Sequence, residues 1–250
     1  MAGLSVFPVP GLPEIGKGAE LPVMIRDAAV AAGSPLQSGD IVVVTSKIVS
    51  KAEGRTVVLA DVEVSEFSRR YAEKWEKDPA VIELVFREAK RVVRQLGPVL
   101  ITETHHGFVC ANSGVDQSSS GGHGLAVLLP VDPDGTAKAY RAGFLALGLD
   151  VAVIISDTFG RPWREGQTDI AIGIAGMDPL FSYIGQTDPH GHVFRVQVLS
   201  QADELAGAAE LVKGNISRVP VAVIRGYAWE RNEEATMRGV IRDSERDLFR

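Results

Sequence analysis

The segment SDTFGRPWREGQTDIAIG, residues 156–173, follows directly on the apolar run VAVII and begins with oxygen-bearing side chains. Asp157 supplies a carboxylate and Thr158 a hydroxyl, and oxygen ligands of these kinds suit Mg²⁺ or Mn²⁺. Because a buried strand usually ends in a plainer turn, we expect a binding site where this strand emerges. The alternative is that these polar groups only cap the chain.

Cationic and aromatic side chains follow in the same segment. Arg161 and Arg164 can neutralise phosphate or carboxylate charge, and Trp163 can cover a flat ligand. Asp169 leads into a Gly- and Ala-rich stretch where the backbone can approach a ligand closely. Together these residues predict a ligand that is anionic and partly aromatic.

Hydroxyl and ammonium groups gather in a second segment, VVVTSKIVSKAEGR at residues 42–55. A predicted strand ends there in Thr45 and Ser46, and Lys47 and Lys51 follow. Such groups suit phosphate oxygens, through hydrogen bonds and point charge. A solvated turn that carries charges is the alternative.

A third segment, CANSGVDQSSSGG at residues 110–122, places Asp116 in a Gly- and Ser-rich loop. A carboxylate in such a loop predicts a hard-metal ligand, because oxygen donors can converge there and waters complete the shell. An Asx-type turn is the alternative. The stretch QSSSGGHG at 117–124 predicts a mobile or ligand-closing loop.

The stretch GLPEIGKG, residues 11–18, nearly matches the phosphate-binding P-loop pattern. However, Gly18 stands where a Ser or Thr hydroxyl should hold magnesium, and Pro13 lacks one of the N–H donors that form the cradle. The preceding SVFPVP is too rich in proline for a central strand. We therefore do not expect a P-loop.

The histidines and the cysteine give weaker signals. His105 and His106 are adjacent, so a strand would point their rings apart, and His190 and His192 flank a glycine in a predicted hairpin turn. Cys110 has apolar neighbours and is expected to be buried rather than reactive. With one cysteine in the chain, neither a structural zinc site nor a disulfide framework is expected.

The composition is that of an ordinary folded protein of 250 residues with a net charge of −6. This charge does not favour sequence-independent binding of nucleic acid. The N-terminus lacks a signal-peptide pattern, and no apolar stretch approaches the roughly 20 residues that span a bilayer. We expect a cytoplasmic protein that binds neither nucleic acid nor membrane.

Hydrophobic patterns predict strands and helices in irregular alternation, which favours a mixed α+β fold. Strands are predicted at residues 41–46, 56–60, 99–102, 125–129, 151–156, 193–199 and 221–225. Helices are predicted at residues 79–96, around 67–75, 140–147 and 205–212, and in the tail from residue 232.

Several long blocks of the sequence resemble the coenzyme F420-0:L-glutamate ligase family, in family order over nearly the whole chain. The blocks are FPVPGLP, DIVVVTSKIVSKAEGR, NSGVDQSS, LLPVDPDGTA, VAVIISDTFGRPWREGQTDIAIGIAG and ADELAGAAELVKG…VPVAVIRG. The resemblance implies a single ligase unit over residues 1–250, built from two interleaved α+β subdomains in an intertwined homodimer. The chain resembles the stand-alone form of the family, which lacks a C-terminal flavin-binding domain.

The resemblance also implies an activity. Members of the family join L-glutamate to a carboxylate of coenzyme F420-0, or its dehydro precursor, and extend the tail through γ-glutamyl linkages. They use GTP, two divalent ions (Mg²⁺ or Mn²⁺) and K⁺, and they release GDP and phosphate. We expect an acyl phosphate intermediate, because an unactivated carboxylate is a poor electrophile.

Site residues follow from the motifs that align. The expected nucleotide-binding residues are Pro10, Gly11, Leu12, Pro13, Thr45, Ser46, Lys51, Ser119, Lys213, Gly214, Asn215, Ile216, Ser217, Arg218, Val219 and Pro220. The expected metal ligands are Asp116 and Asp157 for one ion and Thr158 for a second, with Asn215 as a further ligand. The expected catalytic residues are Asp157, Lys51, Arg161 and Asp169, the last to orient or deprotonate the incoming amine.

Three departures from the family pattern bear on these assignments. The aspartate loop often continues with Ser-Asn, but Gln117 and Ser118 stand here, which weakens the contact expected at Ser119. Ser156 replaces a common threonine conservatively. Asn215 stands where some relatives carry an acidic metal ligand, so the second metal site has less charge.

Three other functions fit parts of the pattern. A related ligase would use another amino acid or another carboxylate acceptor. A metal-dependent phosphohydrolase would use the same aspartates and basic residues without an amine. A non-catalytic nucleotide sensor would bind GTP without turning it over. The motifs leave the tail length, the acceptor's oxidation state, the preferred metal and the choice of GTP over ATP open.

Overall fold

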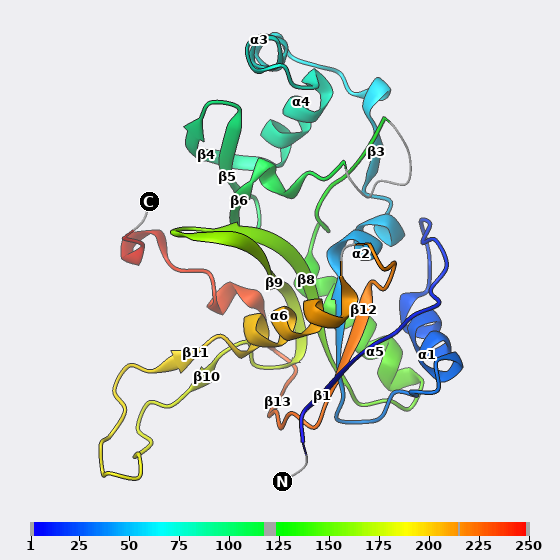
Figure 1. The fold of residues 1–250 in the computed structure, drawn as a ribbon, viewed down its shortest axis with the longest axis vertical. Coiled ribbons are helices and arrows are strands. Elements are labelled where there is room, and N and C mark those ends of the chain that lie inside the picture. Colours follow the sequence, from blue (N-terminus) through cyan, green and yellow to red (C-terminus); the bar gives the residue numbers. More distant parts are fainter. Residues whose placement is uncertain (1–2, 118–123, 215, 249–250) are drawn as a thin grey trace.

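A six-stranded mixed sheet organises the larger part of the protein, which is a computed structural model that describes residues 3–117, 124–214 and 216–248 (Figure 1). The strand order is β1 (Ser5–Pro8), β12 (Val221–Arg225), β2 (Ile41–Thr45), β8 (Ala152–Arg161), β9 (Arg164–Met177) and β13 (Arg231–Asn232). Only β2 and β8 are paired in parallel, and all other neighbours are antiparallel.

The central strands are continuous apolar runs because both faces of the sheet are covered. Val42 and Val44 of β2 pack on one face against α1 (Leu21–Ala31), α2 (Ser46–Glu53) and α5 (Pro133–Ala146). Ile41 and Val43 point to the other face, which α6 (Gln201–Lys213) covers with Leu205, Ala206 and Ala209. Each such buried valine or isoleucine contributes about 1.5–3 kcal/mol.

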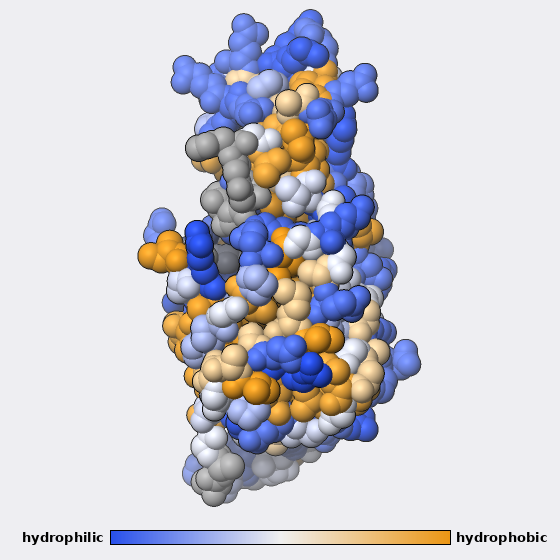
Figure 2. All heavy atoms as spheres, turned by 90° about the vertical axis from the view of Figure 1, so that its right-hand side faces the viewer, coloured by the Kyte–Doolittle hydropathy of each residue, from blue (hydrophilic) through white to orange (hydrophobic). Residues whose placement is uncertain are grey.

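A smaller subdomain is inserted between β2 and β8 and stands above the large sheet in Figure 1. It contains α3 (Glu66–Trp75), α4 (Pro79–Glu88), the pair β3 (Thr56–Val58) and β7 (Leu125–Val127), and the sheet β4 (Ala89–Leu96), β5 (Val99–Thr104) and β6 (Val109–Ala111). It has apolar clusters of its own. Its far end is mainly hydrophilic, whereas hydrophobic and hydrophilic patches alternate on the face that carries α1 (Figure 2). The predicted mixed α+β class is confirmed.

An arm projects from the large sheet between β9 and α6 (Figure 1). Its only regular strands are the short pair β10 (Phe181–Ser182) and β11 (Val198–Leu199). Exposed apolar side chains along it include Ile184, Val193 and Val196. The prediction of a strand over 193–199 was therefore wrong except at its end, because residues 193–197 follow an irregular path along the arm.

Two predicted helices were also wrong in part or whole. The helix expected over 79–96 ends at Glu88, and residues 89–96 form β4. Val92, Val93 and Leu96 fit either period, and the turn at Gly97 and Pro98 lets β4 pair with β5. As far as residue 248, where the described chain ends, the tail from residue 232 forms only the end of β13 and the short 3₁₀ turns Met237–Gly239 and Ser244–Arg246.

Other expected elements were found. The stripe at 67–75 is α3, the helix expected at 140–147 is α5, and that at 205–212 is α6, which ends before Gly214. Strand β8 continues five residues beyond the expected end at Ser156, to Arg161. Most of the Gly- and Ser-rich loop at 117–124 lies outside the described residues. Among the helices of the described chain, none is long and apolar enough to cross a membrane.

Candidate active site

The predicted binding segments meet at one end of the large sheet, the end at which β1 and β2 finish and β12 begins. Thr45, the last residue of β2, pairs in register with Ser156, which lies in the middle of the parallel strand β8. The antiparallel strand β12 begins at the same end, where the Thr45 amide donates to the carbonyl of Pro220 at 2.9 Å. Strand β1 ends there, and the Val9 amide donates to the carbonyl of Val221 at 2.9 Å. Segments 10–13, 45–51, 157–158 and 216–220 are therefore brought together.

The first loop lies against α2. Lys51 Nζ forms an ion pair with Glu14 at 2.5 Å, and the Gly18 amide donates to the carbonyl of Ala52 at 2.8 Å. Helix α1 begins at Leu21, so Lys17 precedes the helix instead of opening it, as a P-loop lysine would. Strand β1 is an edge strand, as its prolines indicated. The near match to a P-loop is therefore not one in structure.

A cleft of about 520 Å³ opens between this end and the inserted subdomain. Asp116 reaches it from the inserted subdomain, and its Oδ2 forms an ion pair with Nζ of Lys47 on α2 at 2.9 Å. The residues that line the cleft are Ser46, Lys47, Ser50, Cys110, Ala111, Asn112, Gly114, Val115, Asp116, Val127, Leu128, Asp157, Thr158, Phe159, Gly160, Gln167 and Ile216. The two aspartates expected to share a metal therefore lie on the walls of one cleft.

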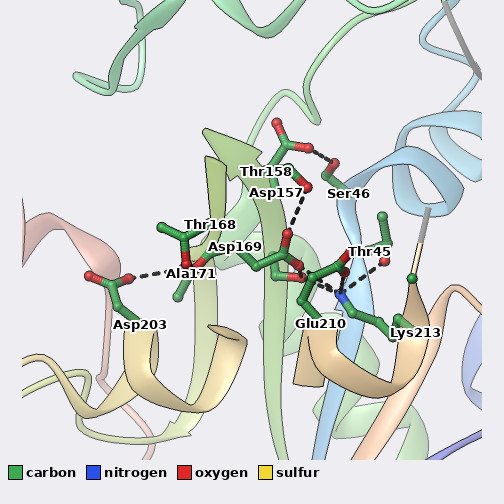
Figure 3. Close-up of polar contacts among 12 residues, drawn as sticks. Thr45, Ser46, Asp157, Thr158, Thr168, Asp169, Ala171, Asp203, Glu210 and Lys213 are labelled. Carbon is green, nitrogen blue, oxygen red and sulfur yellow. Dashed lines mark hydrogen bonds and ion pairs between the residues drawn. The ribbon is translucent and has the colours of Figure 1, made fainter. Parts of the chain in front are cut away.

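Asp157 projects from β8 toward α2, and Ser46 Oγ donates to its Oδ1 at 2.8 Å (Figure 3). Burial raises the pKa of Asp157 to about 6, although the hydrogen bond from Ser46 favours the ionised form. Burial, with the nearby Asp157 carboxylate, also raises the pKa of the Cys110 thiol to about 12. Cys110 is thus buried and unreactive, as its neighbours in the sequence indicated.

Thr158 projects to the opposite face of β8, because successive residues of a strand alternate (Figure 3). Its Oγ1 donates to Asp169 Oδ1 at 2.7 Å. Asp169 Oδ2 accepts from Ser156 Oγ at 2.9 Å and from Lys213 Nζ at 2.8 Å. Lys213 also donates to Ser156 Oγ at 2.8 Å and to Thr45 Oγ1 at 3.2 Å. A buried ion pair therefore lies next to the hydroxyls of Thr45, Ser156 and Thr158.

The remaining expected residues are distributed unevenly. Lys213 and Asp169 are only about 2% exposed and are not among the residues that line the cleft. Arg161 and Arg164 are exposed at the tip of the β8–β9 hairpin, where Trp163 is 76% exposed with a positive φ, and the hairpin tip does not line the cleft. Ser119 and Asn215 lie outside the described residues.

None of the four histidines in the described part of the chain lines the cleft. His105 and His106 occupy the turn after β5, so the expectation of opposite strand faces was wrong, and the ring Nε2 of His106 lies 2.9 Å from the carbonyl of Pro130. His190 and His192 lie in the expected turn, where both amides donate to Asp188 Oδ1.

The donor set of the cleft suits a hard cation. Asp116, Asp157 and Thr158 offer only oxygen atoms. In the part of the chain that the structure describes, no three His, Cys, Asp or Glu side chains converge on one point as a metal site. An ion here would need waters or phosphate oxygens as additional ligands, as Mg²⁺ commonly does beside a nucleotide.

Comparison with known proteins gives consistent matches. A sequence profile described as F420-0:Gamma-glutamyl ligase matches residues 11–226. The chain is 40% identical over 251 residues to the coenzyme F420:L-glutamate ligase of Methanothermobacter thermautotrophicus, with 99% of each chain covered. It is 39% identical over 252 residues to the ligase of the same name from Methanopyrus kandleri, covering 99% of this chain and 98% of that one. With the Halobacterium salinarum protein, also of that name, identity is 38% over 256 residues, and coverage is 99% and 97%.

Proposed function

Because this chain belongs to the F420-0:gamma-glutamyl ligase family, we propose that it joins L-glutamate to a carboxylate of coenzyme F420-0 or its dehydro precursor. The bond formed is an amide, and later cycles extend the tail through γ-glutamyl linkages. GTP supplies the driving force and leaves as GDP and phosphate. The names of relatives that match almost the whole chain support this assignment.

One observation carries the proposal beyond the family name. Segments suited to phosphate and segments suited to a cation, which are far apart in the sequence, converge on a single cleft. Ser46 and Lys47 come from the start of α2, directly after β2, Asp157 from the middle of β8, and Asp116 from the inserted subdomain. A site that transfers a phosphoryl group needs both kinds of ligand in one place.

The proposed chemistry has two steps. A carboxylate oxygen of the acceptor attacks the γ-phosphorus of GTP, which breaks the bond to GDP and forms an acyl phosphate. The amine of glutamate then attacks the acyl carbon, the C–O bond to phosphate breaks, and the amine loses a proton to solvent or a nearby base. GTP meets the need for a leaving group, because an unactivated carboxylate does not lose its oxygen to an amine.

The chain's own residues bind and orient in this scheme. Lys51 would exchange its contact with Glu14 for a phosphate oxygen, and Lys47 lies where it can do the same from Asp116. The loop Pro10–Pro13, Thr45, Ser46, and the residues from Gly214 to Pro220 would hold the rest of the nucleotide. Arg161 would reach the acceptor only if the hairpin tip moved toward the cleft.

Asp116, Asp157 and Thr158 fit as ligands of Mg²⁺ or Mn²⁺, with Asn215 as a further ligand of a second ion. Such ions, when bound, offset the negative charge of the phosphate oxygens. K⁺ is a further part of the proposal. The carboxylate of Asp157 must be ionised to serve as a ligand, and a bound cation would favour its ionised form.

We also propose a homodimer. The arm between β9 and α6 exposes Phe181, Ile184 and Val196, and a second copy would cover these apolar side chains. Sedimentation equilibrium of the wild type and of Val196→Asp tests this directly. We expect a dimer that the substitution weakens, and a monomeric wild type would contradict the proposal.

Mass spectrometry tests the function as a whole. The protein is incubated with F420-0, L-glutamate, GTP, Mn²⁺ and K⁺, and each component is omitted in turn. We expect the acceptor to gain glutamyl mass units only when GTP and the divalent ion are present. Release of phosphate without glutamate, and no mass gain, would instead indicate a phosphohydrolase.

A further inference from the structure

Lys213 and Asp169 form an ion pair beside Ser156, and the pair is almost completely buried. The two side chains are each about 1% exposed, and their charged atoms lie 2.8 Å apart. Lys213 is the last residue of α6, and Asp169 lies within β9 (Figure 3). Such a pair is costly to bury, and pairs of this kind are often replaceable by apolar residues. Its presence next to two predicted ligand-binding hydroxyls therefore needs a reason.

The reason lies in which group donates each hydrogen bond. An ammonium group can donate three hydrogen bonds and accepts none, and an ionised carboxylate can only accept hydrogen bonds. Lys213 gives its three protons to Asp169, Ser156 and Thr45. Ser156 must then use its own single proton toward Asp169 Oδ2, at 2.9 Å.

The same hydrogen bonds fix the roles of the hydroxyls of Thr158 and Thr45. Thr158 must donate to Asp169 Oδ1, at 2.7 Å, so only its oxygen lone pairs remain for the cleft. Thr45 Oγ1 accepts from Lys213 at 3.2 Å, so its own proton remains available, and within the described ranges this hydroxyl donates no hydrogen bond. Thr45 stands beside the chain at Pro220, and Thr158 lines the cleft.

We propose that Lys213 and Asp169 are a positioning pair that sets Thr45 as a hydrogen-bond donor to an anion and Thr158 as an oxygen ligand for a cation. Neither member of the pair touches substrate. Lys213 acts on a nucleotide phosphate through Thr45, and Asp169 acts on a divalent ion through Thr158. This inference rests on the proposed function for the identity of the anion and the cation.

A double-mutant cycle separates this role from direct contact and from simple support of the fold. The neutral pair variant Lys213→Met with Asp169→Asn avoids leaving either charge buried alone. It is combined with Thr45→Val, and the affinity for a non-hydrolysable GTP analogue is measured by calorimetry. In parallel it is combined with Thr158→Val, and Mn²⁺ affinity is measured by electron paramagnetic resonance.

We expect the neutral pair variant to lose about tenfold in each affinity, as for the loss of one charge-assisted hydrogen bond. Thr45→Val should lose a similar factor for the nucleotide, and the combination should lose no more than Thr45→Val alone. Thr158→Val should behave in the same way for Mn²⁺. In Thr45→Ser, which keeps the hydroxyl, the neutral pair should still cost about tenfold.

Losses that multiply in the combined variants would overturn the proposal, because Lys213 or Asp169 would then act independently of the threonines. Unchanged affinities in a folded neutral pair variant would overturn it as well. A wild type that binds both probes but adds no glutamate would refute only the proposed ligase function. A wild type that binds neither would refute both.

Discussion

Two ion pairs, each with a buried carboxylate, lie at opposite ends of the large sheet and differ in how they use their hydrogen bonds. At the end away from the cleft, Arg225 of β12 binds Asp40 with two parallel hydrogen bonds of 2.7 Å. The backbone amide of Gln37 also donates to Asp40 Oδ2. At the cleft end, Lys213 divides its protons among one carboxylate and two hydroxyls.

The difference shows what each cation is suited to do. The planar guanidinium of Arg225 matches the carboxylate of Asp40 and also bonds the carbonyl of Pro35, so it ties the strand end to the preceding loop. The ammonium of Lys213 is a point charge with three separate donors, which can direct hydroxyls on two strands. We conclude that one pair fastens the sheet and the other orients a site.

The largest effect should come from the cleft end. Asp157→Asn removes a carboxylate that the proposed cation needs, so glutamate addition should fall at least about a hundredfold. Initial rates of mass gain, with saturating Mn²⁺ and GTP, measure this. The circular dichroism spectrum should match that of the wild type. Turnover near the wild-type rate would refute the role of Asp157.

Arg225→Met should produce a loss of stability without a loss of chemistry. Asp40 is 1% exposed, so the substitution would leave its carboxylate buried without its cation, at a cost of about 3 kcal/mol. Urea unfolding gives the free energy of unfolding. The turnover of the folded fraction should equal that of the wild type, and a drop in turnover would remove the distinction between the two ends.

The buried Asp157 carboxylate at the cleft end should lower the free energy of unfolding once the pH is high enough to ionise it. The pKa of Asp157 is raised by burial from the ordinary 3.8 to about 6, so between these values the folded protein binds a proton that the unfolded chain does not. This contribution to stability is therefore full below about pH 4 and is lost as the pH rises through 6. Without metal, Asp157→Asn should be more stable than the wild type by about 2–3 kcal/mol at pH 7.5 and equal to it near pH 4.

Urea unfolding with a chelator, from pH 4 to 7.5, tests this pH dependence. Asp40→Asn is the matched control, since it changes a buried carboxylate at the far end of the same sheet. A constant difference between wild type and Asp157→Asn over this range would contradict the raised pKa.

Arg225→Lys should give the smallest effect. The lysine keeps the charge but loses one of the parallel hydrogen bonds, which should lower the free energy of unfolding by about 1 kcal/mol and leave turnover unchanged. A loss as large as that of Arg225→Met would show that geometry, more than charge, holds this end of the sheet together.

Local pattern was sufficient for part of the fold. The runs that became β2, β8 and β12 are continuous, apolar and rich in branched residues, so their strands could be predicted. It failed at residues 89–96, because Val92, Val93 and Leu96 suit a helix face as well as a strand. Pairing with β5 across the turn at Gly97 decided for the strand.

The sequence by itself determined which polar groups follow the buried apolar runs: Thr45 and Ser46 after one run, and Asp157 and Thr158 after another. It also placed Asp116 in a polar loop, because residue type and local order are sufficient for that. Tertiary structure alone decided which groups meet. Parallel pairing of β2 with β8 brings the end of β2 beside the middle of β8, and the inserted subdomain carries Asp116 to the cleft.

The pairing of Lys213 with Asp169 is the clearest case of such a decision. The two residues are 44 positions apart, and no helical or strand period relates them. They meet because α6 packs on the face of the sheet to which Asp169 points. Both charges are buried there, so each is stabilised by pairing with the opposite charge. The sequence therefore determined which polar groups are present, and tertiary packing determined which of them donate and which accept the hydrogen bonds.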